Sequence, residues 1–340
     1  MQNIFIIYTG GTIGMVQDKE TGTFVPFDFE LIARNLPDLA RLNYKLTVHS
    51  FTPIIDSSNM RPSIWVEMAQ IIKDNYEQYD GFVILHGSDT MSFSASILSF
   101  MLEGLQKPVI LSGSQLPIGE IRTDARENMM TALEIASAKE NGKSIIQEVC
   151  ILFDNKLFRG NRSFKYHSSK FEAFRSPNYP VLAEAGIHIN YNRDALLDNS
   201  GKEFILHTEL DNRVGVLKLF PGISEETTRT ILSADVRSIV METFGSGNTM
   251  TDPWFLDLLA DTIRGGKNII DISQCKVGSV ELGRYETSQG LKALGVTNGY
   301  DMTFESAVTK LMYLQGQLKD QAEVAYWVEQ SIRGEITIND

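Results

Sequence analysis

Short, nearly continuous apolar runs recur along the chain and are separated by longer segments with a mixed pattern. Runs of this length are typical of parallel strands that are buried on both faces of a sheet. The clearest runs cover residues 4–8, 82–85, 109–111, 149–153, 214–219, 239–241 and 269–272. The pattern therefore predicts strands at these positions.

The segments between these runs carry apolar residues at spacings of three and four, as the buried face of an amphipathic helix requires. They include residues 64–76, 94–105 and 122–139, and two further segments near 303–318 and 321–332 lie close to the end of the chain. Strands that alternate with helices in this way predict an α/β fold with a parallel sheet.

One interval interrupts the alternation. From about residue 175 to residue 212 the chain is rich in Pro, Asn, Asp, Gly and Ser, which favour turns and loops. We therefore expect a parallel-sheet N-terminal domain over residues 1–188 that carries the catalytic residues, a linker over 189–212, and a smaller α/β C-terminal domain over 213–340. A length of 340 residues also fits two domains better than one.

Charge and cysteine content narrow the possible partners and the compartment. The chain has 31 Lys and Arg against 43 Asp and Glu, and its net charge of −12 repels nucleic acid and anionic membranes. No apolar stretch reaches transmembrane length, and the first residues lack the pattern of a signal peptide. Two cysteines, Cys150 and Cys275, make no disulfide framework. We expect a cytoplasmic protein without nucleic-acid or membrane partners.

The histidines do not show the spacing of a metal site. The five histidines form no His-Glu-x-x-His motif, and no Cys/His cluster has zinc spacing. His86 ends a predicted strand and is interpreted as a packed, hydrogen-bonded residue. We expect neither a metal nor an organic cofactor.

Several predicted strands are followed by unusually polar segments, and ligands of parallel sheets bind where strands end and helices begin. TGGTIG follows the first run, HGSDTM the second and SGSQ the third, and RGNRSFK lies beyond the fourth. Each segment alone is compatible with a turn or a helix cap. Together they would bring the hydroxyl of Thr12, the pair Ser88 and Asp89, and the amine of Lys165 to one sheet edge. Nucleophilic catalysis needs these groups: a hydroxyl, a base that takes its proton, and neighbours that tune the base.

With these motifs the chain resembles the bacterial L-asparaginase family, in particular its cytoplasmic type I branch. The segments YTGGTIG at 8–14 and GFVILHGSDTM at 81–91 are similar to the family's TGGTI and HGTDTM signatures. Supporting matches, which extend the resemblance over essentially the whole chain, are DSSNM at 56–60, GSQ at 113–115, RGNR at 159–162, PGI at 221–223 and GSGN at 245–248. The resemblance implies hydrolysis of L-asparagine to L-aspartate and ammonia.

The resemblance also implies roles for individual residues. Thr12 is expected to be the nucleophile that attacks the side-chain amide and forms an acyl-enzyme intermediate. Ser88, Asp89 and Lys165 are expected to activate a hydroxyl or a water molecule. This role requires that the amine of Lys165 is not freely hydrated.

Substrate contacts are implied for an overlapping set of positions. The expected substrate-binding residues are Asp56, Ser57, Ser58, Ser88, Asp89, Gly113 and Ser114. Carboxylates and hydroxyls suit the ammonium and carboxylate groups of a zwitterionic amino acid. The resemblance implies that backbone donors near Gly113 and Ser114 stabilise an oxyanion. A homodimer or homotetramer is implied as well.

Three positions depart from the family pattern. Ser88 stands where threonine is usual; serine keeps the hydroxyl but loses the methyl group that fixes its rotamer. Phe24 lies near a loop position that normally carries tyrosine, so a proton relay through a phenol is in question. Cys275 matches the cysteine of an allosteric asparagine site, but Glu242 replaces the expected arginine and would repel a ligand carboxylate. We expect this form of asparagine activation to be lost or altered.

Three other functions stay open at this point. The glutaminase-like subunit of archaeal tRNA-dependent amidotransferases resembles the same motifs, but it carries an extra N-terminal module, and a charge of −12 disfavours tRNA. Glutamine is a closer alternative substrate, since one methylene is worth only about 1–3 kcal/mol of discrimination. The third alternative is a catalytically silent module that binds asparagine or a dinucleotide.

Overall fold

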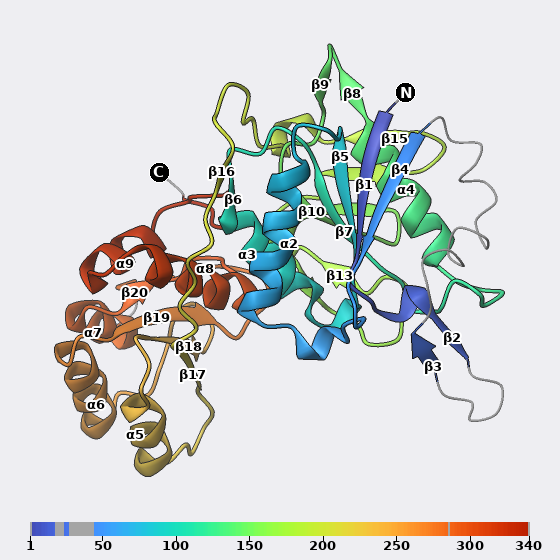
Figure 1. Cartoon of the computed structure of the whole chain (residues 1–340). Coiled ribbons are helices and arrows are strands. Elements are labelled where there is room, and N and C mark those ends of the chain that lie inside the picture. Colours follow the sequence, from blue (N-terminus) through green and yellow to red (C-terminus); the bar gives the residue numbers. More distant parts are fainter. Residues whose placement is uncertain (1, 18–23, 27–43, 285, 339–340) are drawn as a thin grey trace. The chain divides into compact units, whose positions relative to one another are not determined.

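The computed structural model describes the chain except for residues 1, 18–23, 27–43, 285 and 339–340. The chain forms two compact units, Met1–Thr208 and Glu209–Asp340, and each contains its own main sheet (Figure 1). The predicted domain boundaries stay a prediction. Within the range predicted as a linker, the chain adds strand β15 (Ile189–Tyr191) to the sheet of the first unit.

The first unit is built on an eight-stranded sheet in the order β15-β14-β11-β10-β7-β5-β1-β4. The parallel strands are β4 (Tyr44–Ser50), β1 (Gln2–Tyr8), β5 (Gly81–Leu85), β7 (Val109–Ser112) and β10 (Val149–Phe153). The antiparallel strands beyond β10 are β11 (Lys156–Arg159), β14 (Ala183–Ala185) and β15. The predicted α/β fold with a mainly parallel sheet is confirmed.

Helices cover both faces of this sheet. Helices α2 (Pro62–Asn75) and α3 (Met91–Met101) lie on one side and α4 (Ala125–Ser137) on the other (Figure 1). Because side chains alternate along a strand, Ile4 and Ile6 of β1 face the same way and share a core with α4. The interior strands are therefore apolar on both faces, as their sequence pattern indicated.

The sequence pattern did not predict strand β4, because this strand lies at the edge of the sheet. Its polar and apolar residues alternate, and Tyr44, Leu46 and Val48 are the partly buried residues that pack against the core. A half-buried edge strand lacks the continuous apolar run by which an interior strand is recognised.

Short two-stranded sheets complete the first unit. Their strands are β2 (Met15–Gln17), β3 (Phe24–Pro26), β6 (Leu102–Glu103), β8 (Lys139–Glu140), β9 (Lys143–Ser144), β12 (Phe164–Lys165), β13 (Phe174–Arg175) and β16 (Ile205–Leu206). The pair formed by β12 and β13 is important for the site because it carries Lys165.

The second unit has a four-stranded parallel sheet in the order β17-β18-β19-β20. The strands are β17 (Val214–Lys218), β18 (Ser238–Thr243), β19 (Asn268–Ser273) and β20 (Thr297–Asn298). The helices are α5 (Glu225–Ser233), α6 (Pro253–Arg264), α7 (Glu286–Leu294), α8 (Phe304–Gln317) and α9 (Gln321–Val328). The predicted smaller α/β unit is confirmed.

A fully buried ion pair ties α8 to the C-terminal segment. Lys310 Nζ lies 2.5 Å from Glu335 Oε1, and both side chains are 0% exposed. The ammonium group also donates to the backbone carbonyls of Val328 at 2.7 Å and Gln330 at 2.6 Å. Two backbone N–H groups donate to the carboxylate, so both charges are compensated.

Replacing Lys310 with methionine is expected to lower the free energy of unfolding by about 3 kcal/mol, because Glu335 would keep a buried charge without its cation. Urea unfolding at neutral pH measures the change. The double variant Lys310→Met with Glu335→Gln leaves no unpaired charge and should recover part of the loss. A double variant no more stable than the single one would show that packing, not charge, is responsible.

Asp271 is a buried carboxyl group on β19. It is 0% exposed; its Oδ1 accepts a hydrogen bond of 2.6 Å from Thr243 Oγ1, whereas Oδ2 has no partner among the described residues. Burial raises the pKa of Asp271 to about 7, against the opposing effect of the Thr243 hydrogen bond. The folded chain therefore keeps this proton at pH values where the unfolded chain releases it.

Asp271 is expected to make the chain less stable as the pH rises from about 4 to about 7. In this window the folded state binds more protons than the unfolded state, so the free energy of unfolding falls with rising pH. The variant Asp271→Asn lacks this effect, and its stability relative to the unmodified chain should increase across the window. Urea unfolding at several pH values tests this, and a difference that does not vary with pH would contradict it.

Candidate active site

Polar turns follow neighbouring parallel strands of the first unit. Three of them contain short 3₁₀ helices: η3 (Ser57–Asn59) after β4, η1 (Thr12–Gly14) after β1, and η4 (Ser88–Thr90) after β5. A fourth turn, residues 113–115, follows β7. Because the strands are parallel, their carboxyl ends meet at one edge of the sheet, where ligands of α/β proteins bind.

Glycines allow these turns to touch. A Cβ on Gly11 would lie 2.6 Å from Cα of Gly87, and one on Gly87 would lie 2.6 Å from Oγ of Ser57. A Cβ on Gly10 would lie 2.4 Å from the carbonyl oxygen of Ile55. Gly10 and Gly11 also have φ values of 136° and 93°, which other residues rarely adopt. The double glycine therefore places the turn of Thr12 directly against the turn of Ser88.

The variant Gly87→Ala isolates the close contact from backbone strain, because φ at Gly87 is −64°. The new Cβ would collide with Ser57, so we expect a loss of about 1–3 kcal/mol in the free energy of unfolding. Gly119→Ala is the matched control, since its Cβ would meet no heavy atom within 4 Å. Equal stability of the two variants in urea unfolding would contradict the close packing of the turns.

Lys165 joins the turn after β5 by two hydrogen bonds. Its Nζ donates to Ser88 Oγ at 2.8 Å and to Asp89 Oδ1 at 2.6 Å. The Lys165 side chain is 17% exposed and that of Asp89 is 66% exposed. The amine is thus held by two partners and largely shielded from water. The three residues predicted to act together lie in one cluster.

The remaining predicted residues lie in the same set of turns. Thr12 begins η1 and is half-buried. Asp56 caps η3, where its carboxylate accepts the N–H of Ser58 at 2.8 Å, and both residues are exposed. Ser57 is buried, and its carbonyl accepts the hydroxyl of Thr90 at 2.7 Å. The predicted substrate-binding turn is therefore linked directly to η4.

The turn at 113–115 is fixed by side chains that the sequence did not single out. The Asn128 side chain donates to the carbonyl of Gly113 at 2.9 Å, and Asp124 accepts the backbone N–H of Gln115 at 2.9 Å. The hydroxyl of Ser114 donates to the carbonyl of Leu116 at 2.6 Å. No sequence signal distinguishes Asp124 or Asn128 from other polar residues at a helix start.

His86 lies beneath η4 in a buried hydrogen-bonded chain. Its Nδ1 donates to the carbonyl of Gly87 at 2.6 Å, and its Nε2 accepts the hydroxyl of Ser94 at 2.8 Å. Ser94 in turn accepts the indole N–H of Trp65 at 2.9 Å. Burial lowers the pKa of His86 to about 4, so the ring is neutral. The interpretation of His86 as a packed, hydrogen-bonded residue agrees with these contacts.

Two expectations concern other parts of the chain. The loop over residues 18–23 lies outside the described residues, as does the side chain of Phe24. The absence of a proton relay through a tyrosine at this point therefore stays a prediction. In the second unit, Glu242 is buried and its carboxylate lies 3.2 Å from Lys218 Nζ. Cys275 is exposed. The loss of asparagine activation through Cys275 and Glu242 also stays a prediction.

Within the part of the chain that the structure describes, no three His, Cys, Asp or Glu side chains are grouped so that they could hold a metal ion. The same residues include no helix that is both long and apolar enough to cross a membrane.

The parallel sheet, with its polar turns gathered at one edge, defines an α/β protein of the class that binds its ligand at the carboxyl ends of the strands. The chain matches the family model "Asparaginase, N-terminal" over residues 3–197 and the model "Glutaminase/Asparaginase C-terminal domain" over residues 213–327. It therefore belongs to the asparaginase family.

Named relatives agree with this assignment over the full chain. L-asparaginase 1 of Escherichia coli is 41% identical, with 100% of this chain and 99% of that protein covered. The crystal structure of L-asparaginase I from Vibrio cholerae superposes with a TM-score of 0.91 at 40% identity and covers 99% of both chains. The 60 kDa lysophospholipase of Mus musculus is 40% identical, with 99% of this chain but 63% of that protein covered.

Proposed function

We propose that this protein is an L-asparaginase, which hydrolyses L-asparagine to L-aspartate and ammonia. The observation that carries the proposal is the amine of Lys165, which is hydrogen-bonded to Ser88 and Asp89 beside the turn that holds Thr12. Family membership and the full-length similarity to an L-asparaginase support the same reaction.

We assign the nucleophilic attack to Thr12. Its Oγ1 adds to the carbon of the side-chain amide, and the tetrahedral intermediate collapses to an ester of Thr12 while the amide nitrogen leaves as ammonia. Water then adds to the ester carbon, and aspartate departs as the hydroxyl of Thr12 is restored. Within the cluster of Ser88, Asp89 and Lys165, the neutral amine of Lys165 accepts the proton of the attacking oxygen and then, as the ammonium form, returns it to the leaving group.

The negative oxygen of the tetrahedral intermediate needs fixed donors. We assign this role to the backbone at Gly113 and Ser114. Hydrogen bonds between this turn and the side chains of Asp124 and Asn128 fix its conformation. Backbone donors there do not need to reorganise as charge develops. Fixed donors of this kind are usually the largest single contribution to catalysis of acyl transfer.

Charge complementarity supports the substrate assignment. The carboxylates of Asp56 and Asp89 are both exposed at the edge that carries the cluster, as contacts for an α-ammonium group require. The hydroxyls of Ser57 and Ser58 supply donors for the α-carboxylate. The zwitterionic head of an amino acid thus finds partners of both kinds, while its side-chain amide extends toward Thr12.

The remaining assignments rest on the family. The chain acts as a homodimer or homotetramer in the cytoplasm, with L-asparagine as its small-molecule partner. It uses no metal or organic cofactor. A net charge of −12 repels nucleic acid and anionic membranes, so it has no partner of either kind.

Ammonia release from L-asparagine by the purified chain tests the proposal. Ammonia and aspartate should appear in equal amounts, and L-glutamine, which is one methylene longer, should react at least about tenfold more slowly in kcat/KM. A chain that binds asparagine in calorimetry but releases no ammonia would be a silent binding module. Faster turnover of glutamine would make it a glutaminase.

A further inference from the structure

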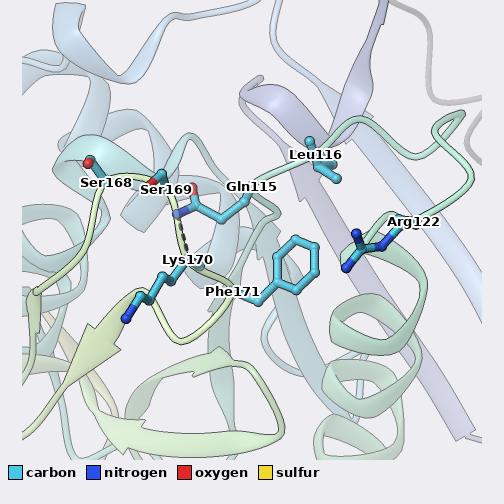
Figure 2. A pocket seen from close by; sticks show the side chains of 7 residues that line it. All are labelled: Gln115, Leu116, Arg122, Ser168, Ser169, Lys170 and Phe171. Atoms are coloured by element: carbon cyan, nitrogen blue, oxygen red, sulfur yellow. Dashed lines mark hydrogen bonds between the residues drawn. The ribbon is translucent and has the colours of Figure 1, made fainter.

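A hollow lies between two segments of the chain that continue from candidate site residues. It has a volume of about 560 Å³, within the range of pockets that hold small organic ligands. One wall follows Ser114 in the chain and the other follows Lys165. The lining residues are Gln115, Leu116, Arg122, Ser168, Ser169, Lys170 and Phe171 (Figure 2).

Hydrogen bonds hold both walls in place. The side-chain amide of Gln115 donates to the carbonyl of Lys170 at 2.8 Å and so links the two walls (Figure 2). The backbone N–H of Gln115 donates to Asp124 at 2.9 Å. On the other wall, the N–H groups of Ser169 and Lys170 both donate to His167 Nδ1 at 3.1 Å. The hollow is therefore preformed, which lowers the cost of binding.

The lining combines an apolar floor with a cation. The ring of Phe171 lies between Gln115 and Arg122 in the view of Figure 2, and the guanidinium group of Arg122 is directed toward it. The ammonium group of Lys170 points away from the other lining side chains (Figure 2). Asp124 lies two residues after Arg122 and is not one of the lining residues; its carboxylate accepts three N–H donors.

We propose that this hollow binds a small organic anion, in which a carboxylate or phosphate group is joined to an aromatic or aliphatic part. Arg122 holds the oxyanion, since a planar guanidinium forms paired hydrogen bonds with carboxylate and phosphate oxygens. Phe171 and Leu116 cover the apolar part. The hydroxyls of Ser168 and Ser169 add donors at the rim. The site is independent of the reaction proposed above.

Titration calorimetry on the full chain tests this with four probes. Phenyl phosphate and phenylacetate carry both groups and differ in the oxyanion; inorganic phosphate lacks the apolar part, and benzyl alcohol lacks the charge. At least one of the two aromatic anions should bind roughly tenfold more tightly than either partial probe, because both halves of the lining contribute. The stronger of the two identifies the oxyanion. Equal affinities for all four probes would overturn the proposal.

Variants locate the binding. Arg122→Gln should weaken the better aromatic anion roughly tenfold, as the loss of a charged hydrogen-bond partner predicts. Arg126→Gln removes the same charge from an exposed residue that does not line the hollow, and should leave the affinity unchanged. Saturation with L-aspartate should not displace the probe. Displacement by aspartate, or equal affinities of the two variants, would overturn the assignment to this hollow.

Discussion

The variant Thr12→Ala is expected to lower kcat for L-asparagine by about 10⁴-fold or more, because the covalent step loses its nucleophile. The backbone that leads into η1 is shaped by Gly10 and Gly11, through their positive φ values and their close contacts with Ile55 and Gly87. The fold should therefore survive the substitution. Ammonia release at saturating asparagine measures the loss, and urea unfolding shows that the chain remains folded.

Thr12→Ser is the matched variant, because it keeps the hydroxyl and removes one methyl group. Its kcat should stay within about 100-fold of the unmodified chain, since the loss concerns rotamer preference and not the attacking atom. If Thr12→Ala kept more than about one hundredth of the activity, another hydroxyl would be the nucleophile. Ser88→Ala would then identify the neighbouring serine as that group.

Much of the fold follows from local hydrophobic pattern. The interior strands β5 and β10 have every residue buried, so they appear in the sequence as unbroken apolar runs. The antiparallel strand β11 has only four residues, and β14 and β15 are shorter still and partly exposed. None carries such a run, and β14 and β15 lie in the interval that is rich in turn-forming residues. Periodicity therefore predicts the centre of the sheet better than its edges.

The candidate site, too, could be predicted from the sequence only in part. The order of the strands brings the hydroxyl, carboxylate and amine groups to one edge, and this follows from parallel α/β topology. The sequence does not show why the turns approach so closely. That depends on the contact of Gly11 with Gly87, two positions far apart in the chain. The sequence also does not reveal that Ser94 hydrogen-bonds to His86, or that Trp65 donates to Ser94, because the spacing of these residues on α2 and α3 is that of any packed helix.

Lys165→Met is expected to lower kcat by about 10³-fold or more, because the cluster loses the amine that accepts and returns the proton. Methionine is unbranched and close to lysine in length, so it fills the same space. The hydroxyl of Ser88 and the carboxylate of Asp89 would each lose the partner that now lies within 2.8 Å. Ammonia release at saturating asparagine gives kcat, and the asparagine dependence gives KM.

The matched control is Lys156→Met, which removes an amine from an exposed ion pair with Glu172 at 3.3 Å in the same part of the chain. Exposed pairs contribute little, so its activity and stability should be nearly unchanged. Lys165→Arg keeps the positive charge but replaces the compact amine with a broader group that cannot release a proton. If Lys165 acts only as a cation, this variant should retain most of the activity. If it exchanges protons, as we propose, Lys165→Arg should be nearly as slow as Lys165→Met.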